Sequence, residues 1–287
     1  MQEFSVLLPV YGGDSLAFFR EAVRSNTVGQ ARRPSQLVVA RDGRVPDEVE
    51  EYLVRLPGLL EPEGVAVTVV RLEECRGLAA ALNEGLKACA HEFVARADAD
   101  DIALPERYAV EIPVLEAGAD LVGSSIQEFT QESADRGDKI ERGQVRTLPA
   151  GGPELERYAR MQSPLHHPSV AFRRSAVLDA GGYPERAGRF EDYLLWARLM
   201  MRGAKLRNVP DVLVLYRVDA GAYTRRGGWE MFRGELGLQR AFLKMGFVNV
   251  PQFARNVLVR AAYRLVPTGL RQRGYRAVVA LRGRKRP

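Results

Sequence analysis

The chain has 287 residues, of which 46% are hydrophobic, and its 42 Lys and Arg against 36 Asp and Glu give a net charge of +6. This length allows one large α/β domain, or one domain with a substantial appendage, and the apolar content is enough for a full core. We find no apolar stretch long enough to cross a bilayer and no pattern of a secretion signal in the first residues. Two Cys and three His are too few for a disulfide framework or a zinc site. We therefore expect a reduced cytoplasmic protein.

Strand-like and helix-like segments alternate through the first half of the chain. Short runs rich in β-branched residues predict strands at residues 4–10, 36–40, 65–70 and 121–126, with another beginning at Phe93. Helical spacing predicts helices over about 15–27, 47–56, 78–90 and 106–116. This order predicts an α/β fold: a mostly parallel, Rossmann-like sheet with helices on both faces.

The second half is less regular. Residues 130–152 are polar and aperiodic, which predicts a connection that is either a lid or a disordered segment. Beyond it we expect strands at 169–172 and 212–216. Helices are expected at 154–161, 174–180, from Glu191 onward and at 229–245, followed by two basic helical pieces from 250 to 287 that are interrupted at 267–269.

Polar residues follow the predicted strands at the point where each strand ends. Tyr11, Asp42, Arg76 and the acidic run that begins at Asp98 would all lie at the carboxyl edge of a parallel sheet, where α/β folds bind ligands. The plain alternative is that loops are polar and that these residues share no task.

Three carboxylates within four residues, Asp98, Asp100 and Asp101, repel one another unless a cation lies among them. Oxygen ligands of this kind suit Mg²⁺ or Mn²⁺, which keep coordination positions open for phosphate oxygens. The alternative is a solvated acidic turn in which Asp101 caps the next helix.

Seven short motifs follow one another along the chain. They are SVLLPVY (5–11), RG (76–77) with NEG (83–85), ADADD (97–101) with LPER (104–107), HP (167–168), GGY (181–183), EDYLLW (191–196) and YR (216–217). With these motifs in this order, the sequence from about residue 4 to residue 220 resembles the family 2 inverting glycosyltransferases, which use nucleotide sugars and have the GT-A fold.

The resemblance implies a donor site for a nucleoside-diphosphate sugar, with UDP as the expected nucleotide. Tyr11 would stack on the nucleobase, Asp42 would accept from the uracil ring, and Asp100 would bind Mg²⁺ or Mn²⁺. Where relatives carry a further acidic residue, this chain has Arg41, which would either reach a phosphate or lie in solvent. The complete implied donor set is Pro9, Tyr11, Asp42, Arg76, Asp98, Ala99 and Asp100.

The resemblance also implies an acceptor site. Asp192 matches the position of the catalytic base, although a carboxylate in the first turn of a helix is equally common as a capping group. Asp219 stands where many relatives have a histidine near the phosphates. It would either bind the metal or make no interaction equivalent to that of the histidine. The implied acceptor-binding residues are His167, Gly182, Tyr183, Glu191 and Trp196.

The charge is unevenly distributed. Residues 236–287 carry 12 Lys and Arg and no Asp or Glu, whereas the other 235 residues carry 30 basic and 36 acidic side chains. A basic amphipathic region of this kind either lies on an anionic membrane surface or packs on the rest of the protein with its arginines in water. No motif or aromatic platform indicates nucleic-acid binding.

We therefore expect an inverting glycosyltransferase that acts on a hydroxyl of a saccharide or lipid-linked acceptor, in the synthesis of cell-surface polysaccharide or glycolipid. It would be cytoplasmic, with the inner membrane face as a further location if the tail binds lipid. Residues 1–235 would form the catalytic domain, with nucleotide-binding and acceptor halves at about 1–127 and 153–235, and 236–287 the basic helical region. The alternatives are a catalytically silent nucleotide-sugar-binding or scaffold protein, or a sugar-1-phosphate nucleotidyltransferase.

Overall fold

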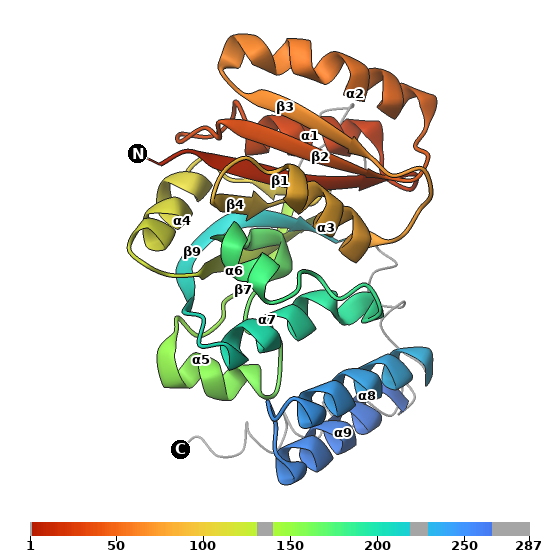
Figure 1. The fold of residues 1–287 in the computed structure, drawn as a ribbon, viewed down its shortest axis with the longest axis vertical. Helices are drawn as coiled ribbons and strands as arrows, with labels where there is room; N and C mark the ends of the chain where they lie inside the picture. Colours follow the sequence, from red (N-terminus) through yellow and green to blue (C-terminus); the bar gives the residue numbers. More distant parts are fainter. Residues whose placement is uncertain (1, 131–139, 219–228, 266–287) are drawn as a thin grey trace. The chain divides into compact units, whose positions relative to one another are not determined.

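The computed structural model describes residues 2–130, 140–218 and 229–265. These residues form two compact units, one within 1–186 and 191–219 and the other within 187–190 and 220–287. The larger unit contains the sheet and the predicted site residues that the structure describes, and the smaller unit is helical (Figure 1).

Within the described residues, nine strands form one sheet in the order β3-β2-β1-β4-β8-β6-β9-β5, with β7 paired to β6. The neighbours β3, β2, β1 and β4 are parallel, as are β6 and β9, whereas β8, β5 and β7 pair in antiparallel fashion. The strands are β1 (Phe4–Tyr11), β2 (Gln36–Asp42), β3 (Ala66–Arg71), β4 (Phe93–Arg96), β5 (Ile102–Ala103), β6 (Leu121–Thr130), β7 (Glu141–Arg146), β8 (Ala171–Arg173) and β9 (Leu206–Arg217).

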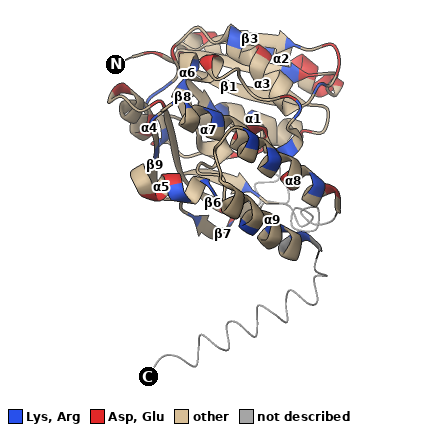
Figure 2. Ribbon diagram, turned by 60° about the horizontal axis from the view of Figure 1, so that its bottom comes forward, with Lys and Arg blue, Asp and Glu red and all other residues tan. Residues whose placement is uncertain are grey.

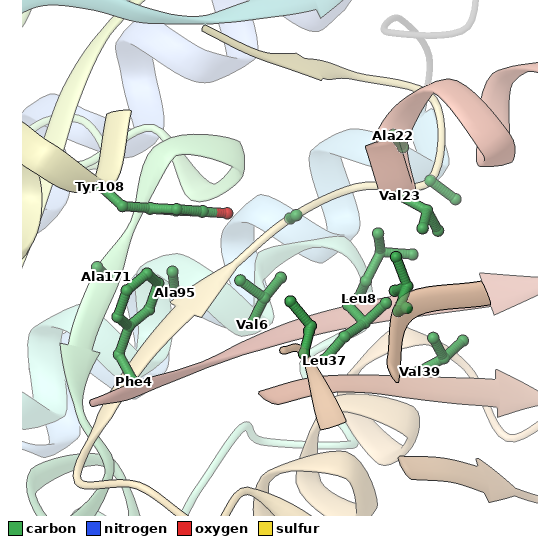
Figure 3. Close-up of a cluster of buried hydrophobic side chains, with 14 of the residues drawn as sticks. Phe4, Val6, Leu8, Ala22, Val23, Leu37, Val39, Ala95, Tyr108 and Ala171 are labelled. Atoms are coloured by element: carbon green, nitrogen blue, oxygen red, sulfur yellow. The ribbon is translucent and has the colours of Figure 1, made fainter. Parts of the chain in front are cut away.

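Helices cover both faces of this sheet because the strands are apolar on both sides. In β1, Val6 and Leu8 enter a core shared with α1, α2 and α4, part of which Figure 3 shows, whereas Leu7 enters a second core shared with α3 and α7. The helices are α1 (Leu16–Asn26), α2 (Asp47–Leu60), α3 (Leu78–Ala88), α4 (Arg107–Glu116), α5 (Gly152–Ala159), α6 (Arg174–Asp179) and α7 (Glu191–Met201), with 3₁₀ turns η1 (Glu61–Glu63) and η2 (His167–Ser169).

The predicted α/β class, with helices on both faces of a largely parallel sheet, is confirmed. The expectation of an irregular connection over 130–152 is wrong in part, because Glu141–Arg146 forms β7 against β6. This strand was not predicted because five of its six residues are charged, polar or glycine, and the remaining one, Val145, is exposed, so the segment has no apolar alternation. Residues 131–139 lie outside the described part of the chain.

The smaller unit is built on a helical hairpin of α8 (Trp229–Lys244) and α9 (Val250–Leu265), preceded in sequence by the 3₁₀ turn η3 (Gly188–Phe190). Buried Asn256 donates to Gln239 at 2.9 Å, and Arg264 pairs with Glu235 at 3.0 Å, so polar contacts fix the register of the two helices. The predicted helix at 229–245 and the first basic piece are confirmed, and residues 266–287 lie outside the described ranges. The domain division at 235/236 stays a prediction. No helix among the described residues is both long and apolar enough to span a membrane.

Candidate active site

The carboxyl ends of β1 and β2 bring two predicted donor-site residues together. Tyr11 and Asp42 are direct partners in the parallel register. Tyr11 is 51% exposed, and its ring lies against Gly13, where an added Cβ would sit 2.6 Å from ring atoms. Glycine at 13 therefore permits this ring position. Pro9 is buried inside β1 beside Ala40, so it shapes the strand rather than presenting a side chain.

Asp42 holds the loop that follows β3. Its carboxylate accepts hydrogen bonds from the backbone N–H groups of Arg76 at 2.7 Å and Gly77 at 2.8 Å, and from the thiol of Cys75 at 3.3 Å. Gly43 makes this approach possible: its φ is +72°, and a Cβ there would lie 2.6 Å from the Cys75 nitrogen.

The two arginines near this loop are engaged by carboxylates. Arg76 extends its guanidinium to Glu185 at 3.2 Å. Arg41 pairs with Glu50 at 2.9 Å and its side chain is 13% exposed, so it does not lie in open solvent, and a contact with a phosphate stays a prediction.

A buried arginine organises the acidic run after β4. Arg96 is 2% exposed and pairs with Asp98 through both of its terminal nitrogens. Its backbone carbonyl accepts from the buried guanidinium of Arg107 at 2.7 Å, which fixes the strand end. Ala99, 4% exposed, packs into the core beneath. The run is therefore a positioned element and not a loose solvated turn.

The alternative role of Asp101 as a helix cap is wrong. Helix α4 begins at Arg107, and its N-cap position, Glu106, makes no side-chain capping bond. Asp101 is buried, and its Oδ1 accepts the backbone N–H of Arg217 at 2.8 Å, while its Oδ2 has no hydrogen-bond partner among the described residues. Arg217 also donates from Nε to the carbonyl of Asp100 at 2.7 Å. The end of β9 therefore holds two members of the acidic run.

Asp14 joins this run, although its role was not predicted. Its side chain accepts the backbone N–H of Tyr11 at 2.9 Å. Burial raises the pKa of Asp14 to about 7, and the negative charges of Asp100 and Asp98 add to the rise. Partial loss of hydration, with the charge of Asp98, raises the pKa of Asp100 to about 6, although this residue keeps solvent contact. Closely spaced carboxylates with raised pKa values mark this edge of the sheet as a candidate functional site.

The predicted metal ligands fit a divalent cation in chemistry, but only one of them can be placed. Asp100 offers a solvent-accessible carboxylate beside other acidic groups, and the uncompensated Oδ2 of Asp101 lies next to it in sequence. Asp219 lies outside the described residues. In the part of the chain that is described, no three His, Cys, Asp or Glu side chains are grouped so as to enclose a metal.

The predicted base belongs to the same electrostatic neighbourhood. Asp192 lies in the first turn of α7, where its Oδ1 accepts the backbone N–H of Tyr193 at 2.6 Å. Burial raises the pKa of Asp192 to about 6 and that of Glu191 to about 7. Arg96 lowers both values and the charge of Asp98 raises both. Because Asp98 also raises the pKa of Asp100, its charge acts on both the predicted metal ligand and the predicted base.

Three predicted acceptor residues form an aromatic group. The His167 Nε2 and Tyr183 hydroxyl lie 3.1 Å apart, and the His167 and Trp196 ring centroids are 5.9 Å apart. Burial, with Arg96 nearby, lowers the pKa of His167 well below its usual value, so the imidazole is neutral. Trp196 has no exposed surface, which means that it supports the other two rings rather than presenting a face of its own.

Asn83 on α3 holds the turn that carries Gly182 and Tyr183. Its amide donates to the Tyr183 carbonyl at 2.8 Å, and its Oδ1 accepts the Tyr183 N–H at 2.8 Å. Gly182 has a φ of +70°, and a Cβ there would meet the Asn83 Oδ1 at 2.6 Å. Only glycine at 182 fits here without displacing Asn83, so the close contact between this turn and α3 depends on both residues.

Sequence reasoning assigned no role in this site to Arg96 or Asp14, and it expected Asn83, of the NEG motif, to shape helix packing rather than to contact a ligand. Arg96 carried a usable signal, because an arginine in an otherwise apolar predicted strand must be paired when it is buried. Asp14 carried none, since a polar residue in a turn is ordinary.

The chain matches known proteins in sequence. Residues 5–181 match the model described as Glycosyl transferase family 2. The chain is 32% identical to the amylovoran biosynthesis glycosyltransferase AmsE of Erwinia amylovora, over 94% of this chain and 96% of that protein. It is 31% identical to the UDP-Gal:alpha-D-GlcNAc-diphosphoundecaprenol beta-1,3-galactosyltransferase of Escherichia coli, over 96% of each.

Solved structures share the fold. Staphylococcus aureus TarS 1-349 in complex with UDP-GlcNAc matches with a TM-score of 0.66 at 17% identity, over 91% of this chain and 73% of that one. The mannosyltransferase PcManGT of Pyrobaculum calidifontis, in complex with GDP-Man and Mn²⁺, matches with a TM-score of 0.63 at 21% identity, over 91% of this chain and 69% of that one.

Proposed function

Because the chain belongs to glycosyl transferase family 2, we propose that it transfers a sugar from a UDP-sugar to a hydroxyl of a lipid-linked saccharide, with inversion and with a divalent cation. The Escherichia coli relative is named for a UDP-galactose donor and a diphosphoundecaprenol-linked acceptor. The Erwinia relative is named for the biosynthesis of amylovoran. These names support a role in the synthesis of a cell-surface polysaccharide or glycolipid.

One observation carries the proposal: Arg96 and Asp98 influence Asp100 on one side and Glu191 and Asp192 on the other. A single displacement requires a charge-stabilised leaving group and a base on the opposite face of the sugar. Two groups of carboxylates whose pKa values both respond to the Arg96–Asp98 ion pair would supply these two functions.

On the donor side, the exposed ring of Tyr11 is available to stack on a nucleobase. Asp42 retains acceptor capacity for a ring N–H at Oδ1, because this oxygen has two lone pairs and accepts one hydrogen bond from the loop. Its Oδ2 already accepts two. Asp100, with Asp219, would hold Mg²⁺ or Mn²⁺. When bound, such a cation neutralises charge that develops on a departing diphosphate.

On the acceptor side, Asp192 would take the proton of the attacking hydroxyl at Oδ2, since Oδ1 is occupied by the Tyr193 N–H. A pKa of about 6 leaves this carboxylate ionised at neutral pH and more basic than an ordinary aspartate. Glu191 and the neutral His167, with Tyr183 and Gly182, would orient the acceptor. Trp196 would act by holding the rings of His167 and Tyr183.

The alternatives have weaker support. A nucleotidyltransferase would need a basic phosphate loop after the first strand, whereas this chain places the carboxylate of Asp14 there. A silent binding protein would have no use for a buried base position, and Asp192 is present with a raised pKa.

Two experiments test the proposal. UDP binding, measured by calorimetry with and without Mn²⁺, should strengthen with the metal, and equal affinity would remove Asp100 from the metal role. Asp192→Asn should keep UDP-sugar binding while transfer falls about 10²- to 10⁴-fold, the usual contribution of a general base. Asp179→Asn, an exposed carboxylate on α6, is the matched control and should retain full turnover. A panel of nucleotide sugars, scored by hydrolysis, would identify the donor.

A further inference from the structure

The exposed face of α9 has an unusual composition. Helical spacing places its exposed residues on one side, and among the α9 side chains that the structure describes Arg255 is the one exposed charge. Leu258 is 70% exposed, Val259 61% and Val250 66%. The remaining exposed members are Pro251, Ala254 and Ala262.

The opposite side of α9 is already occupied. Asn256, 2% exposed, donates to Gln239 of α8, and Arg260 and Arg264 approach Glu235 at 3.8 and 3.0 Å. These three α9 residues recur every four positions, about half a helical turn from the exposed apolar residues. The apolar residues therefore do not serve the α8–α9 hairpin. A cluster of large apolar side chains left exposed in this way indicates an interaction surface.

The surrounding charge indicates the partner. Residues 236–287 have 12 Lys and Arg and no carboxylate, and seven of these cations lie in 266–287, directly after α9 in sequence. Figure 2 shows Lys and Arg along both α8 and α9. A helix with apolar side chains on one face, in a segment whose charged residues are all basic, fits an anionic bilayer surface. The apolar side chains would enter the acyl boundary, and the cations would contact anionic headgroups.

We propose that the exposed face of α9, formed by Val250, Leu258 and Val259 with Arg255 beside them, docks the protein on an anionic phospholipid bilayer. The docking itself rests on this helix and its charges. Its consequence for catalysis, delivery of the enzyme to a lipid-linked acceptor, rests on the proposed function above.

Flotation with vesicles tests the docking in the full chain. The wild type should bind vesicles of phosphatidylglycerol and phosphatidylcholine, bind pure phosphatidylcholine vesicles at least tenfold more weakly, and be released by high salt. Leu258→Glu with Val259→Glu should reduce binding at least tenfold. The neutral pair Leu258→Gln with Val259→Gln should also reduce it, because apolar insertion is lost without added charge. Val54→Glu, at an equally exposed apolar site on α2 (66%), is the matched control and should bind as the wild type does.

Three results would overturn the proposal: undiminished binding by both double variants, equal binding to charged and uncharged vesicles, or a dimer in light scattering that the double variants abolish while vesicle binding persists. The last result would assign the face to a second copy of the chain.

A parallel assay separates the docking from the proposed activity. The glutamate pair should lose transfer to a lipid-linked acceptor in vesicles at least tenfold and retain transfer to a short water-soluble analogue. Absence of transfer in the wild type with every acceptor would overturn the activity and leave the flotation result standing.

Discussion

Replacing Arg96 with methionine should destabilise the protein and do so more at high pH. The guanidinium is 2% exposed and bonds both oxygens of Asp98, whose side chain is 24% exposed. Removal of one partner from a buried pair costs about 3–5 kcal/mol. Because Asp98 keeps some solvent contact, we expect about 3 kcal/mol at neutral pH.

The sign of the pH dependence follows from the neighbouring carboxyl groups. Burial raises the pKa of Glu191 to about 7 and that of Asp192 to about 6, from 4.5 and 3.8, and Arg96 opposes both shifts. Without Arg96 both pKa values rise further, so the folded state binds more protons than the unfolded state over a wider pH range. The free energy of unfolding therefore falls as the pH rises through that range. The loss should therefore be smaller at about pH 5 than at about pH 8.

Urea unfolding of both proteins at the two pH values measures this effect. Arg33→Met, which breaks an exposed pair with Glu63, is the control and should cost less than about 1 kcal/mol at either pH. A loss below about 1 kcal/mol for Arg96→Met, or an equal loss at both pH values, would refute the view that this arginine balances the charges of the site.

Three further outcomes are expected. The value of kcat/KM should fall below about pH 6, where Asp192 becomes protonated, and a rate profile flat from pH 5 to 8 would remove it as the base. Asn83→Ala should raise the acceptor KM and cost about 1–3 kcal/mol in urea unfolding, because both Tyr183 hydrogen bonds are lost, while UDP affinity stays constant. Gly85→Ala should cost about 1–3 kcal/mol, since the added methyl meets a leucine of β1, whereas Gly58→Ala, with open space around it, should leave the melting temperature equal or higher.

Periodicity was sufficient to predict the alternation of strands and helices in the first half of the chain, because strands buried on both faces read as continuous apolar runs. It failed at Ile102–Ala103, a strand of two residues, and at Glu141–Arg146, whose residues carry no apolar pattern. It also predicted β9 too short, since Leu206–Arg217 contains charged and proline residues in its first half. These segments are strands because they pair with β9 or β6, and the local sequence of a segment does not show which distant segment it pairs with.

The site was predictable where a residue type has a rare use. An aromatic residue at a strand end and three carboxylates in four residues pointed to Tyr11 and Asp100, and the structure places both at the carboxyl edge of the sheet. The supports were less predictable. The hydrogen bonds between Asn83 and Tyr183 join residues 100 positions apart, and the local sequence around neither residue predicts this pairing. The catalytic roles themselves stay predictions.

The way in which Asp42 is held has a consequence for natural variation. The amides of Arg76 and Gly77 that bind its carboxylate belong to the main chain, and every residue type except proline supplies one. The side chain at position 76 can therefore change through evolution while the carboxylate keeps its orientation. In the proposed donor site, exchange of that one side chain would change what is recognised beside the nucleobase, and proline is the replacement that selection should exclude there.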